Sequence, residues 1–449
     1  MPATASASIG APAPNTRRRI VVTGLGVATA LGLEVDSLWY AVDAGRCGIA
    51  EIRQLDASRL PVRLGAEVDV DVLQRRLSEE SGEHEDPVVA ANRTLLFALW
   101  AARRAWAAAG LSLHGCAAAG LDPRRAGVVV GAGVFPAIET MVPPSLDAPD
   151  DVLAAGVGTA HRDAWRAYDL GLVSDLLSSR LGLGGPSITL QAACTSGTQA
   201  IGEALRRLRR GQIDLALTGG ADSMMSLFAV TGFTVLGALS RNPDPATASR
   251  PFDARRDGFV LGEGAGLLVL EELEHARRRG ATILAEVRGY GASADAYRFT
   301  DMDPDARGAI AALHAALTDA DLTPDAIDHV NAHGTSTPQN DRMETLALHE
   351  VFGDHAQRLA VSANKSQLGH LLCAAGGIEA VLTVLALHHQ RLPPTLGLHH
   401  SDPDCDLDYV AGASRAARIR AAVSSSFGFG GQNGCLVLTR PPGDPEAEP

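Results

Sequence analysis

The residue with the clearest chemical setting in this sequence is Cys194, within residues 191–197 (QAACTSG). A run of β-forming residues ends just before it, and a helical pattern begins just after it. A strand-to-helix turn of this kind exposes one side chain as a nucleophile. The helix N-terminus supplies unsatisfied amides and a partial positive charge, which favour a thiolate and can hold a developing oxyanion. Taken alone, the cysteine also fits a small buried residue at a strand end.

Two histidines and a glycine-rich segment have comparable settings. His333 lies in residues 331–338 (NAHGTSTP), just past a strand-like run, and His370 ends residues 364–370 (NKSQLGH), at an expected helix start. Beside glycine and just past a strand, each histidine is positioned by the backbone and not by a long loop. The glycines of residues 426–434 (SFGFGGQNG) permit positive φ and close backbone approach. Each of these segments alone also fits a purely structural role.

Buried strand-like runs alternate with longer helical patterns along the chain. The runs lie at residues 19–27, 126–131, 188–193, 215–219, 266–270, 285–289, 329–332, 359–363, 421–425 and 435–439. Continuous β-branched runs separated by helices predict an α/β protein with mainly parallel sheets covered on both faces. Residues 78–91 and 136–163 contain clusters of Glu, Asp and Pro and are expected to form loops.

The two halves of the sequence repeat one layout. Residues 187–210 run from strand to small residues to helix, and residues 359–390 repeat that order. Apolar residues recur at helical spacing in both helices and predict one buried stripe on each. They are Ile201, Ala204, Leu205 and Leu208, then Ile378, Val381, Leu382 and Leu385. A duplicated α/β unit with a midpoint near residues 275–285 follows, and abundant Ala and Gly suit its close packing.

Composition excludes several function classes. The chain is 46% hydrophobic and 20% charged, and its formal charge of −13 argues against binding to nucleic acid or an anionic membrane. No apolar run approaches the roughly 20 residues of a membrane span, and the N-terminus lacks the apolar core of a signal peptide. The six cysteines are scattered without the spacing of a zinc or redox site, so no metal and a reduced, cytoplasmic protein are expected.

The motif set as a whole resembles the elongating β-ketoacyl synthases of the thiolase superfamily, found in type II fatty-acid and polyketide systems. Residues 249–253 (SRPFD) and 257–266 (DGFVLGEGAG) add to the four segments above, and the resemblance covers about residues 19–440. It implies a five-layer αβαβα fold of two similar halves. The N-terminal half would span residues 19–275 and carry the cysteine, and the C-terminal half 276–440 would carry both histidines. Residues 1–18 and 441–449 are expected to be disordered.

The resemblance also implies a role for each site residue. Cys194 would accept the acyl chain as a thioester, and His333 and His370 would assist decarboxylation of malonyl thioester and stabilise the enolate. Lys365 and Glu379 would organise the site electrostatically. A covalent intermediate of this kind predicts ping-pong kinetics. No cofactor would be bound, because the substrates arrive on the phosphopantetheine of acyl carrier protein.

Further residues would bind and select the substrate. Thr335 and Thr337 would hydrogen-bond the pantetheine arm, and the backbone of Phe429 would join that of Cys194 in the oxyanion hole, with the Phe429 ring as a gate. The residue corresponding to Val134 lines the acyl tunnel of fatty-acid relatives. Phe135, where relatives commonly have glycine, would shorten the tunnel if it points inward and would be purely structural if it points outward.

The partners expected from the resemblance are acyl carrier protein and a second subunit, either another copy or a chain-length-factor-like protein. Carrier proteins are acidic, so docking to this acidic chain requires a local basic surface. Gly237 falls where fatty-acid relatives often carry an arginine for this contact. The docking mode can therefore differ from theirs. The candidates for the basic surface are Arg75, Arg76, Arg206 and Arg210, although the last two also fit a solvated helix face.

Alternatives remain open at this stage. Cys373, three residues after His370, could suggest a thiolase, but a packed helix cysteine fits the elongating family better. A non-elongating partner subunit or a scaffold would keep the fold, yet such subunits usually lack the cysteine. Residues 339–342 (QNDR) resemble the ketosynthases of type II polyketide systems, whereas the 334–338 and 365–370 segments are closer to the fatty-acid type. The sequence therefore favours, without deciding, a specialised polyketide or polyene pathway.

Overall fold

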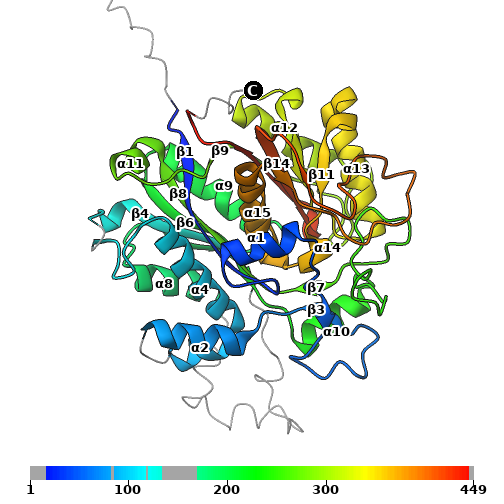
Figure 1. Cartoon of the computed structure of the whole chain (residues 1–449), viewed down its shortest axis with the longest axis horizontal. Coiled ribbons are helices and arrows are strands. Elements are labelled where there is room, and N and C mark those ends of the chain that lie inside the picture. Colours follow the sequence, from blue (N-terminus) through cyan, green and yellow to red (C-terminus); the bar gives the residue numbers. More distant parts are fainter. Residues whose placement is uncertain (1–16, 82–84, 118–119, 134–168, 444–449) are drawn as a thin grey trace, which may run out of the picture.

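The computed structural model describes residues 17–81, 85–117, 120–133 and 169–443. Its centre is a ten-stranded sheet in the order β11-β10-β14-β15-β9-β1-β8-β6-β4-β5 (Figure 1). Along the chain, the first five strands of this sheet are β1 (Ile20–Ala28), β4 (Ala126–Ala132), β5 (Ser187–Leu190), β6 (Leu215–Asp222) and β8 (Gly264–Glu272). The second five are β9 (Ala285–Ala294), β10 (His329–Asn331), β11 (Ala360–Ser362), β14 (Ala421–Gly428) and β15 (Gln432–Thr439).

The strand order shows that the fold is duplicated. Numbered from its own first strand, each set of five has the order 3-2-4-5-1. The two sets meet where β1 pairs antiparallel with β9, through Val21 opposite Glu286 and Val22 opposite Ala285. The predicted α/β fold of two similar halves is confirmed.

The expectation of mainly parallel sheets is wrong. Among the nine strand pairs of the large sheet in the described residues, four are parallel and five are antiparallel. In each half the last strand turns back beside its predecessor and pairs with the first strand. Apolar runs report burial on both faces but not strand direction, so antiparallel strands buried between helix layers give the same pattern.

Helices cover the outer face of each half of the sheet, and two further helices lie between the halves (Figure 1). Helices α4 (Arg93–Ala108) and α8 (Gly171–Leu181) pack on the outer face of the first half. Helices α12 (Arg307–Ala320) and α13 (Pro338–Phe352) lie outside the second half. Between the halves lie α9 (Ser196–Arg209) and α15 (Ala375–His389), which contact strands of both. This central layer gives the five-layer αβαβα arrangement.

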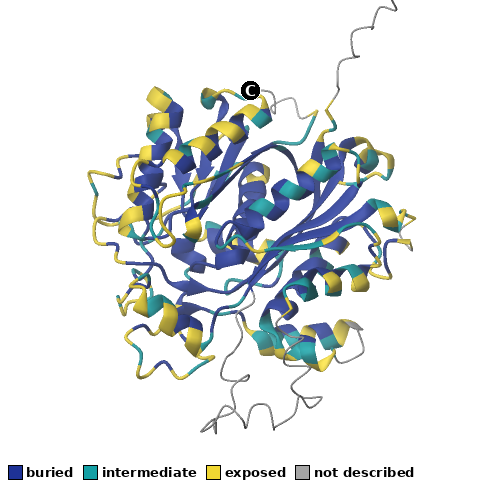
Figure 2. Ribbon diagram, turned by 180° about the vertical axis from the view of Figure 1, so that it is seen from behind, coloured by how far each residue is buried: buried dark blue, intermediate teal, exposed yellow. Residues whose placement is uncertain are grey.

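Helix α15 departs from the expected single buried stripe. Every residue from Ala375 to Leu387 is buried, because the helix has a sheet on each side and α9 beside it (Figure 2). Glycine permits this closeness: a Cβ on Gly377 would lie 2.4 Å from the carbonyl oxygen of Gly266 in β8. The stretch Leu372–His389 is long and apolar enough to cross a membrane by composition, but 89% of it is buried within the protein.

Peripheral elements complete the fold. The helices are α1 (Val35–Asp43), α2 (Val70–Ser81), α3 (Pro87–Ala91), α10 (Leu227–Val235), α11 (Leu273–Arg278) and α14 (Lys365–Leu368). The short strands β2 (Ala50–Glu51), β3 (Leu64–Ala66) and β7 (Leu261–Gly262) form one small sheet, and β12 (Arg391–Leu392) pairs with β13 (Arg415–Ala416).

The loop expected at residues 78–91 is partly helical. Helix α2 continues to Ser81 because Leu73 and Leu77 anchor it in the core. Helix α3 begins with Pro87 at its first position, and the Asp86 carboxylate accepts the Val88 backbone N–H. The acidic and proline residues of this stretch therefore start a helix. The other expected loop, residues 136–163, lies outside the described residues.

Candidate active site

Cys194 sits on a strained turn between β5 and α9. Strand β5 ends at Leu190 and α9 begins at Ser196, and Ala193 between them has a φ of +48°. A positive φ is costly for a residue with a Cβ and persists only where its surroundings enforce it. The hydroxyl of Ser196 enforces it here by accepting the Ala192 backbone N–H at 2.8 Å and donating to the Ala193 carbonyl at 2.6 Å. The predicted nucleophile elbow is present.

His370, from the C-terminal half of the molecule, lies next to Cys194. Its Nε2 lies 3.1 Å from the Cys194 Sγ. The backbone N–H of Leu372 donates to its Nδ1 at 3.2 Å, and its own backbone N–H donates to the Val260 carbonyl at 2.7 Å. Because Nδ1 accepts a hydrogen bond, the proton of the neutral ring resides on Nε2 and points toward the sulfur. In this state His370 donates to groups at the sulfur and does not act as a base.

The His333 ring faces the same cavity as the His370 ring, and it also presents an N–H group there. It follows β10, and the Glu344 carboxylate accepts the backbone N–H groups of both His333 and Gly334 at 2.8 Å. The Lys365 ammonium donates to the His333 Nδ1 at 3.2 Å and to its carbonyl at 2.6 Å. The His333 Nε2 therefore also carries its proton. The rings of His333 and His370 lie 5.3 Å apart, edge to face.

Burial keeps both histidines neutral. It lowers the pKa of His333 and His370 well below the usual range, and the Lys365 ammonium lowers them further. Lys365 is itself neutralised by a buried ion pair with Glu379 of α15. Two neutral rings with N–H groups aimed at one point, next to a buried cation, form a site that stabilises developing negative charge on oxygen.

The expectation that Cys194 rests as a thiolate also changes, because the thiol is buried. Burial raises the pKa of the Cys194 thiol to about 12, although the Lys365 charge and a hydrogen bond from the Phe429 backbone N–H lower it. The helix terminus alone therefore does not ionise the resting thiol. The proton has to leave as the sulfur attacks a thioester, and the departing pantetheine thiol can take it. The hydrogen bond from Phe429 places its N–H where the predicted oxyanion hole requires a donor.

A cavity of about 220 Å³ connects these groups to the surface. Thr335 and Thr337 line it, with their hydroxyl oxygens 2.9 Å apart, as expected for residues that meet the pantetheine arm. Aromatic rings close its inner end. Phe259 meets His370 edge to face at 5.2 Å, Phe427 meets His333 at 5.9 Å, and Phe429 lies beside the sulfur.

The reactive atoms of Cys194, His333 and His370 all lie within 4.8 Å of one another. A set of one thiolate and two imidazoles is chemically able to bind zinc. The Lys365 ammonium, hydrogen-bonded to His333, opposes a second cation at this place. The same three groups match the acyl-transfer chemistry expected from the sequence, which needs no metal.

Some predicted residues are not brought to this site. Val134 and Phe135 lie outside the described residues, so their role in the acyl tunnel stays a prediction. None of the docking candidates lines the cavity: Arg75 and Arg76 are exposed on α2, and Arg206 and Arg210 lie at the far end of α9. Arg76 pairs with Glu34, and the Arg206 guanidinium lies 4.8 Å from the ring centre of Tyr290.

Other residues of the site were not identified from the sequence. Glu344 holds the turn that carries His333, and Phe259 and Phe427 pack on the two histidine rings. Phe259 lies in the 257–266 motif and Phe427 in the glycine-rich segment, so both motifs contained the signal. Glu344 lies inside α13 with no local signal, since its partners are two backbone N–H groups ten or more residues earlier.

Comparisons with known proteins agree with this geometry. The chain matches the β-ketoacyl synthase N-terminal domain over residues 17–276 and the C-terminal domain over 284–399. It is 41% identical to 3-oxoacyl-[acyl-carrier-protein] synthase 2 of Coxiella burnetii, covering 94% of this chain and 99% of that protein. It is 39% identical to the granaticin polyketide putative beta-ketoacyl synthase 1 of Streptomyces violaceoruber, covering 94% and 99%.

Solved structures show the same fold. The ishigamide ketosynthase/chain length factor is 33% identical, with a TM-score of 0.82 over 95% of this chain and 100% of that one. A β-ketoacyl synthase from Burkholderia phymatum is 35% identical, with a TM-score of 0.80 over 94% and 100%. Fold and site together define a condensing enzyme of the thiolase type. The chain belongs to the β-ketoacyl synthase family, and its reaction is the decarboxylative condensation of an acyl thioester with a malonyl thioester.

Proposed function

We propose that this chain elongates acyl groups on acyl carrier protein with malonyl units, in the assembly of a polyketide or polyene in the cytoplasm. The observation that carries the proposal is the convergence of Cys194, His333 and His370, with both histidines presenting N–H groups. All six cysteines are free, which supports a reducing compartment.

The first half-reaction loads the enzyme. The Cys194 sulfur attacks the thioester carbonyl of the incoming acyl chain, and the backbone N–H groups of Cys194 and Phe429 hold the oxyanion. Collapse breaks the bond to the pantetheine sulfur, which leaves with the thiol proton. The raised pKa of Cys194 keeps the free enzyme protonated between turnovers.

The second half-reaction forms the new carbon–carbon bond. Malonyl thioester enters past Thr335 and Thr337, and its carboxylate leaves as CO₂, so the bonding electron pair moves onto the thioester carbonyl as an enolate. The N–H groups of His333 and His370 stabilise the enolate oxygen. The enolate carbon then attacks the acyl carbonyl on Cys194 and expels the sulfur, which regains a proton from solvent.

Exposed arginines near the cavity mouth support a carrier-protein partner. Asp257 lines the mouth, the Arg241 backbone N–H donates to it, and Arg250 pairs with it and donates to the Arg255 carbonyl. Arg241 and Arg255 are exposed. A ketosynthase of a type II polyketide synthase, 29% identical to this chain, has been solved with its acyl carrier protein. We therefore place the docking surface at Arg241 and Arg255, and the arginines of α2 serve as the alternative.

The open edge of the large sheet supports a subunit partner. Strand β5 pairs only with β4 in the described residues, and Ile188 and Leu190 on it are only half-buried. An unpaired apolar edge strand leading directly into the nucleophile elbow is a ready surface for another subunit. Light scattering of the chain alone, and after co-expression with a chain-length-factor-like subunit, distinguishes a homodimer from a heterodimer.

A reconstituted turnover tests the whole proposal. The enzyme is incubated with an acyl carrier protein bearing a short acyl chain, and intact mass spectrometry then follows Cys194. An acyl adduct on the enzyme, followed on adding malonyl carrier by a β-ketoacyl carrier product, supports elongation. An adduct without product identifies a non-elongating subunit, and no adduct identifies a scaffold. Products from repeated rounds without reduction support a polyketide, whereas rounds that continue only after each β-keto group is reduced and dehydrated support a polyene.

The docking surface has its own test. Arg255→Glu is expected to raise KM for carrier-bound malonyl and leave a small thioester analogue unaffected, because only the carrier carries acidic charge to that surface. The double variant of Arg75 and Arg76 to Glu is the comparison. A higher KM only in the α2 variant would move docking to α2.

A further inference from the structure

A second hollow lies at the end of the sheet opposite the catalytic residues. Its volume is about 690 Å³, and it is formed by the start of β1 and β9 and the ends of α9, α12 and β15. Strand β14 runs from this hollow to the active site. Ala421 at its start pairs with Thr439, which lines the hollow, and Gly428 at its end directly precedes Phe429 beside Cys194. This hollow is therefore separate from the active site.

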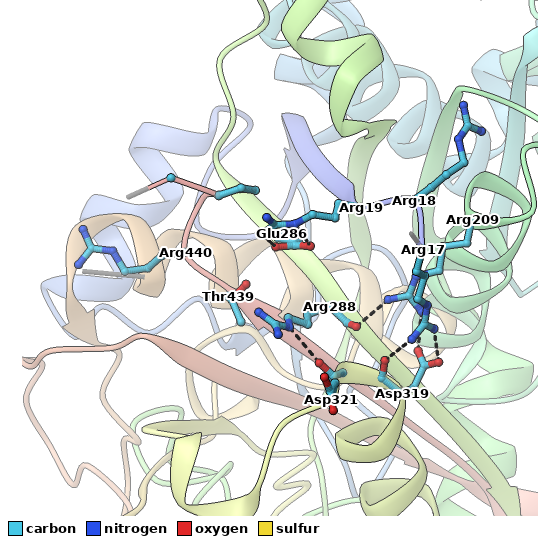
Figure 3. A pocket seen from close by; sticks show the side chains of 13 residues that line it. Arg17, Arg18, Arg19, Arg209, Glu286, Arg288, Asp319, Asp321, Thr439 and Arg440 are labelled. Carbon is cyan, nitrogen blue, oxygen red and sulfur yellow. Dashed lines mark hydrogen bonds and ion pairs between the residues drawn. The ribbon is translucent and has the colours of Figure 1, made fainter. Parts of the chain in front are cut away.

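Arginines dominate the lining of this hollow (Figure 3). They come from both halves of the chain and are Arg17, Arg18, Arg19, Arg209, Arg288 and Arg440. The acidic side chains in the lining are Glu286, Asp319 and Asp321, which leaves a formal excess of three positive charges. In a chain whose net charge is −13, this concentration of positive charge is a local feature and not a consequence of composition.

Ion pairs compensate some of these arginines: Arg18 pairs with Asp214, outside the lining, and Arg19 pairs with Glu286. The pairs at Asp319 are different. Arg17 and Arg209 share the single carboxylate of Asp319, with Arg209 at 2.6 Å. Arg209 is largely buried, and its Nε has no hydrogen-bond partner among the described residues. Two guanidinium groups on one carboxylate leave one positive charge uncompensated at this wall of the hollow.

Arg288 is the second uncompensated charge. Its Nε donates to the Ala320 carbonyl at 2.9 Å, and within the described residues it forms no ion pair. Figure 3 shows its side chain extending between Thr439 and Asp321. Asp321 lies beside it and is exposed, but no ion pair joins the two within the described residues, so the Arg288 guanidinium and the Thr439 hydroxyl both line the open hollow.

We propose that this hollow binds a small molecule that carries a diphosphate group. Arginine forks match phosphate oxygens in geometry and stay charged at any physiological pH. The volume falls within the range of about 300–1,000 Å³ typical of small-molecule sites. Because the arginines come from both sides of the β1–β9 joint, the bound anion links the two halves and stabilises the folded chain.

Titration of the full-length chain with pyrophosphate tests the proposal. At constant ionic strength, pyrophosphate is expected to bind saturably by calorimetry and to raise the unfolding midpoint by about 2 °C or more. Arg288→Gln is expected to weaken binding about tenfold, since a charge-assisted pair is lost, while its condensation rate without pyrophosphate stays unchanged. Arg124→Gln is the matched control, because Arg124 is exposed and pairs only with Asp122 in the described structure.

The outcomes separate the possible sources of the anion. Equal binding in Arg288→Gln and the native chain, or an effect reproduced by sodium chloride, would overturn the site. A nucleoside diphosphate that competes with pyrophosphate supports a soluble ligand. Binding seen only with vesicles that contain phosphatidic acid would overturn the proposal in favour of a membrane surface.

Discussion

The two halves of this molecule share one strand order but have diverged in what they carry at the ends of their strands. In the N-terminal half, the third strand β5 leads into an elbow with Cys194 and then into α9. In the C-terminal half, the third strand β11 leads into α14, and His370 and α15 follow. The duplicated connection from the third strand to the central helix therefore supplies the nucleophile in one copy and a hydrogen-bond donor in the other.

Their different surroundings explain this division of labour. The histidines share their half with the Lys365–Glu379 pair, which supplies a fixed charge close to where an enolate forms. Within the described residues, the Cys194 sulfur has no hydrogen bond to an acid or base of its own half; its polar contacts are His370 and the backbone of Phe429, while the buried Asp222 acts on it only through its charge. The cysteine half therefore holds the acyl chain, and the histidine half handles charge. The predictions below test that division, from the largest expected effect to the smallest.

Replacing the nucleophile is expected to have the largest effect. Cys194→Ala removes the sulfur that lies 3.1 Å from the His370 ring nitrogen, so acylation and condensation should fall by at least about a thousandfold. The fold should persist, because alanine fits the same elbow. Acyl-enzyme formation by intact mass and the thermal midpoint are the measurements.

Cys373→Ala is the matched control from the equivalent region of the other half. Cys373 is also buried, but its backbone N–H is bound to Asp222 and it does not line the cavity. This variant should retain acylation. A Cys194→Ala enzyme that still becomes acylated would contradict the assignment of the nucleophile to the N-terminal half.

Removing a histidine should affect the two half-reactions unequally. His333→Ala or His370→Ala is expected to slow decarboxylation of malonyl carrier by about 10²–10⁴-fold and to slow loading of Cys194 much less. The reason is that both rings donate to the enolate, whereas loading relies on backbone N–H groups. Single-turnover rates of CO₂ release and of acyl-enzyme formation separate the two.

Glutamine at either histidine provides the conservative comparison. Its side-chain amide keeps an N–H donor, so partial recovery of decarboxylation relative to alanine is expected. Equal loss of loading and decarboxylation in the alanine variants would show that the histidines do not belong to one half-reaction.

Breaking the buried ion pair should destabilise the C-terminal half. Lys365→Met leaves the Glu379 carboxyl buried without its cation and is expected to cost about 3 kcal/mol of the free energy of unfolding. The double variant Lys365→Met with Glu379→Gln should recover part of that loss. Denaturant unfolding measures both, and additive losses would mean that the two side chains are energetically independent.

The sequence predicted the reacting groups well because each lies in a local motif. Cys194, His333, His370, Thr335 and Thr337 all follow strands within such motifs, although Glu344 and Val260 also hold the backbone of the two histidine turns. Features that depend on long-range packing could not be predicted. The predicted strand direction was wrong, and α15 is buried on all sides because strands of both halves of the sheet pack against it.

The protonation of the site belongs to the same class of long-range effects. A cysteine at a helix start suggests a thiolate, but the sequence does not show that the surrounding layers bury it and raise its pKa to about 12. Glu344 was missed for a similar reason, since its function is to hold backbone N–H groups of another segment.

The smallest predicted effect concerns acid stability at the end of the last strand of each half. In the N-terminal half, Glu271 of β8 is opposite Val21, and it binds Arg279, His275 at 2.8 Å and Thr23 at 2.5 Å. In the C-terminal half, the corresponding place on β15 is Thr439, opposite Glu286, because both halves have their bulge one residue pair further along. Within the described residues, β8 therefore has a buried carboxylate where β15 has a buried hydroxyl.

That carboxylate should make the stability of the protein depend on pH. Burial raises the pKa of Glu271, but hydrogen bonds from Arg279, His275 and Thr23 outweigh it and lower the pKa from 4.5 to about 2. The depressed pKa contributes stability above pH 4.5 that is lost as the pH falls toward 2. In Glu271→Gln, the loss of unfolding free energy between pH 6 and pH 4 should be about 1 kcal/mol smaller than in the native chain. Glu274→Gln, an exposed glutamate on α11, should leave that slope unchanged, and an unchanged slope in Glu271→Gln as well would remove this difference between the halves.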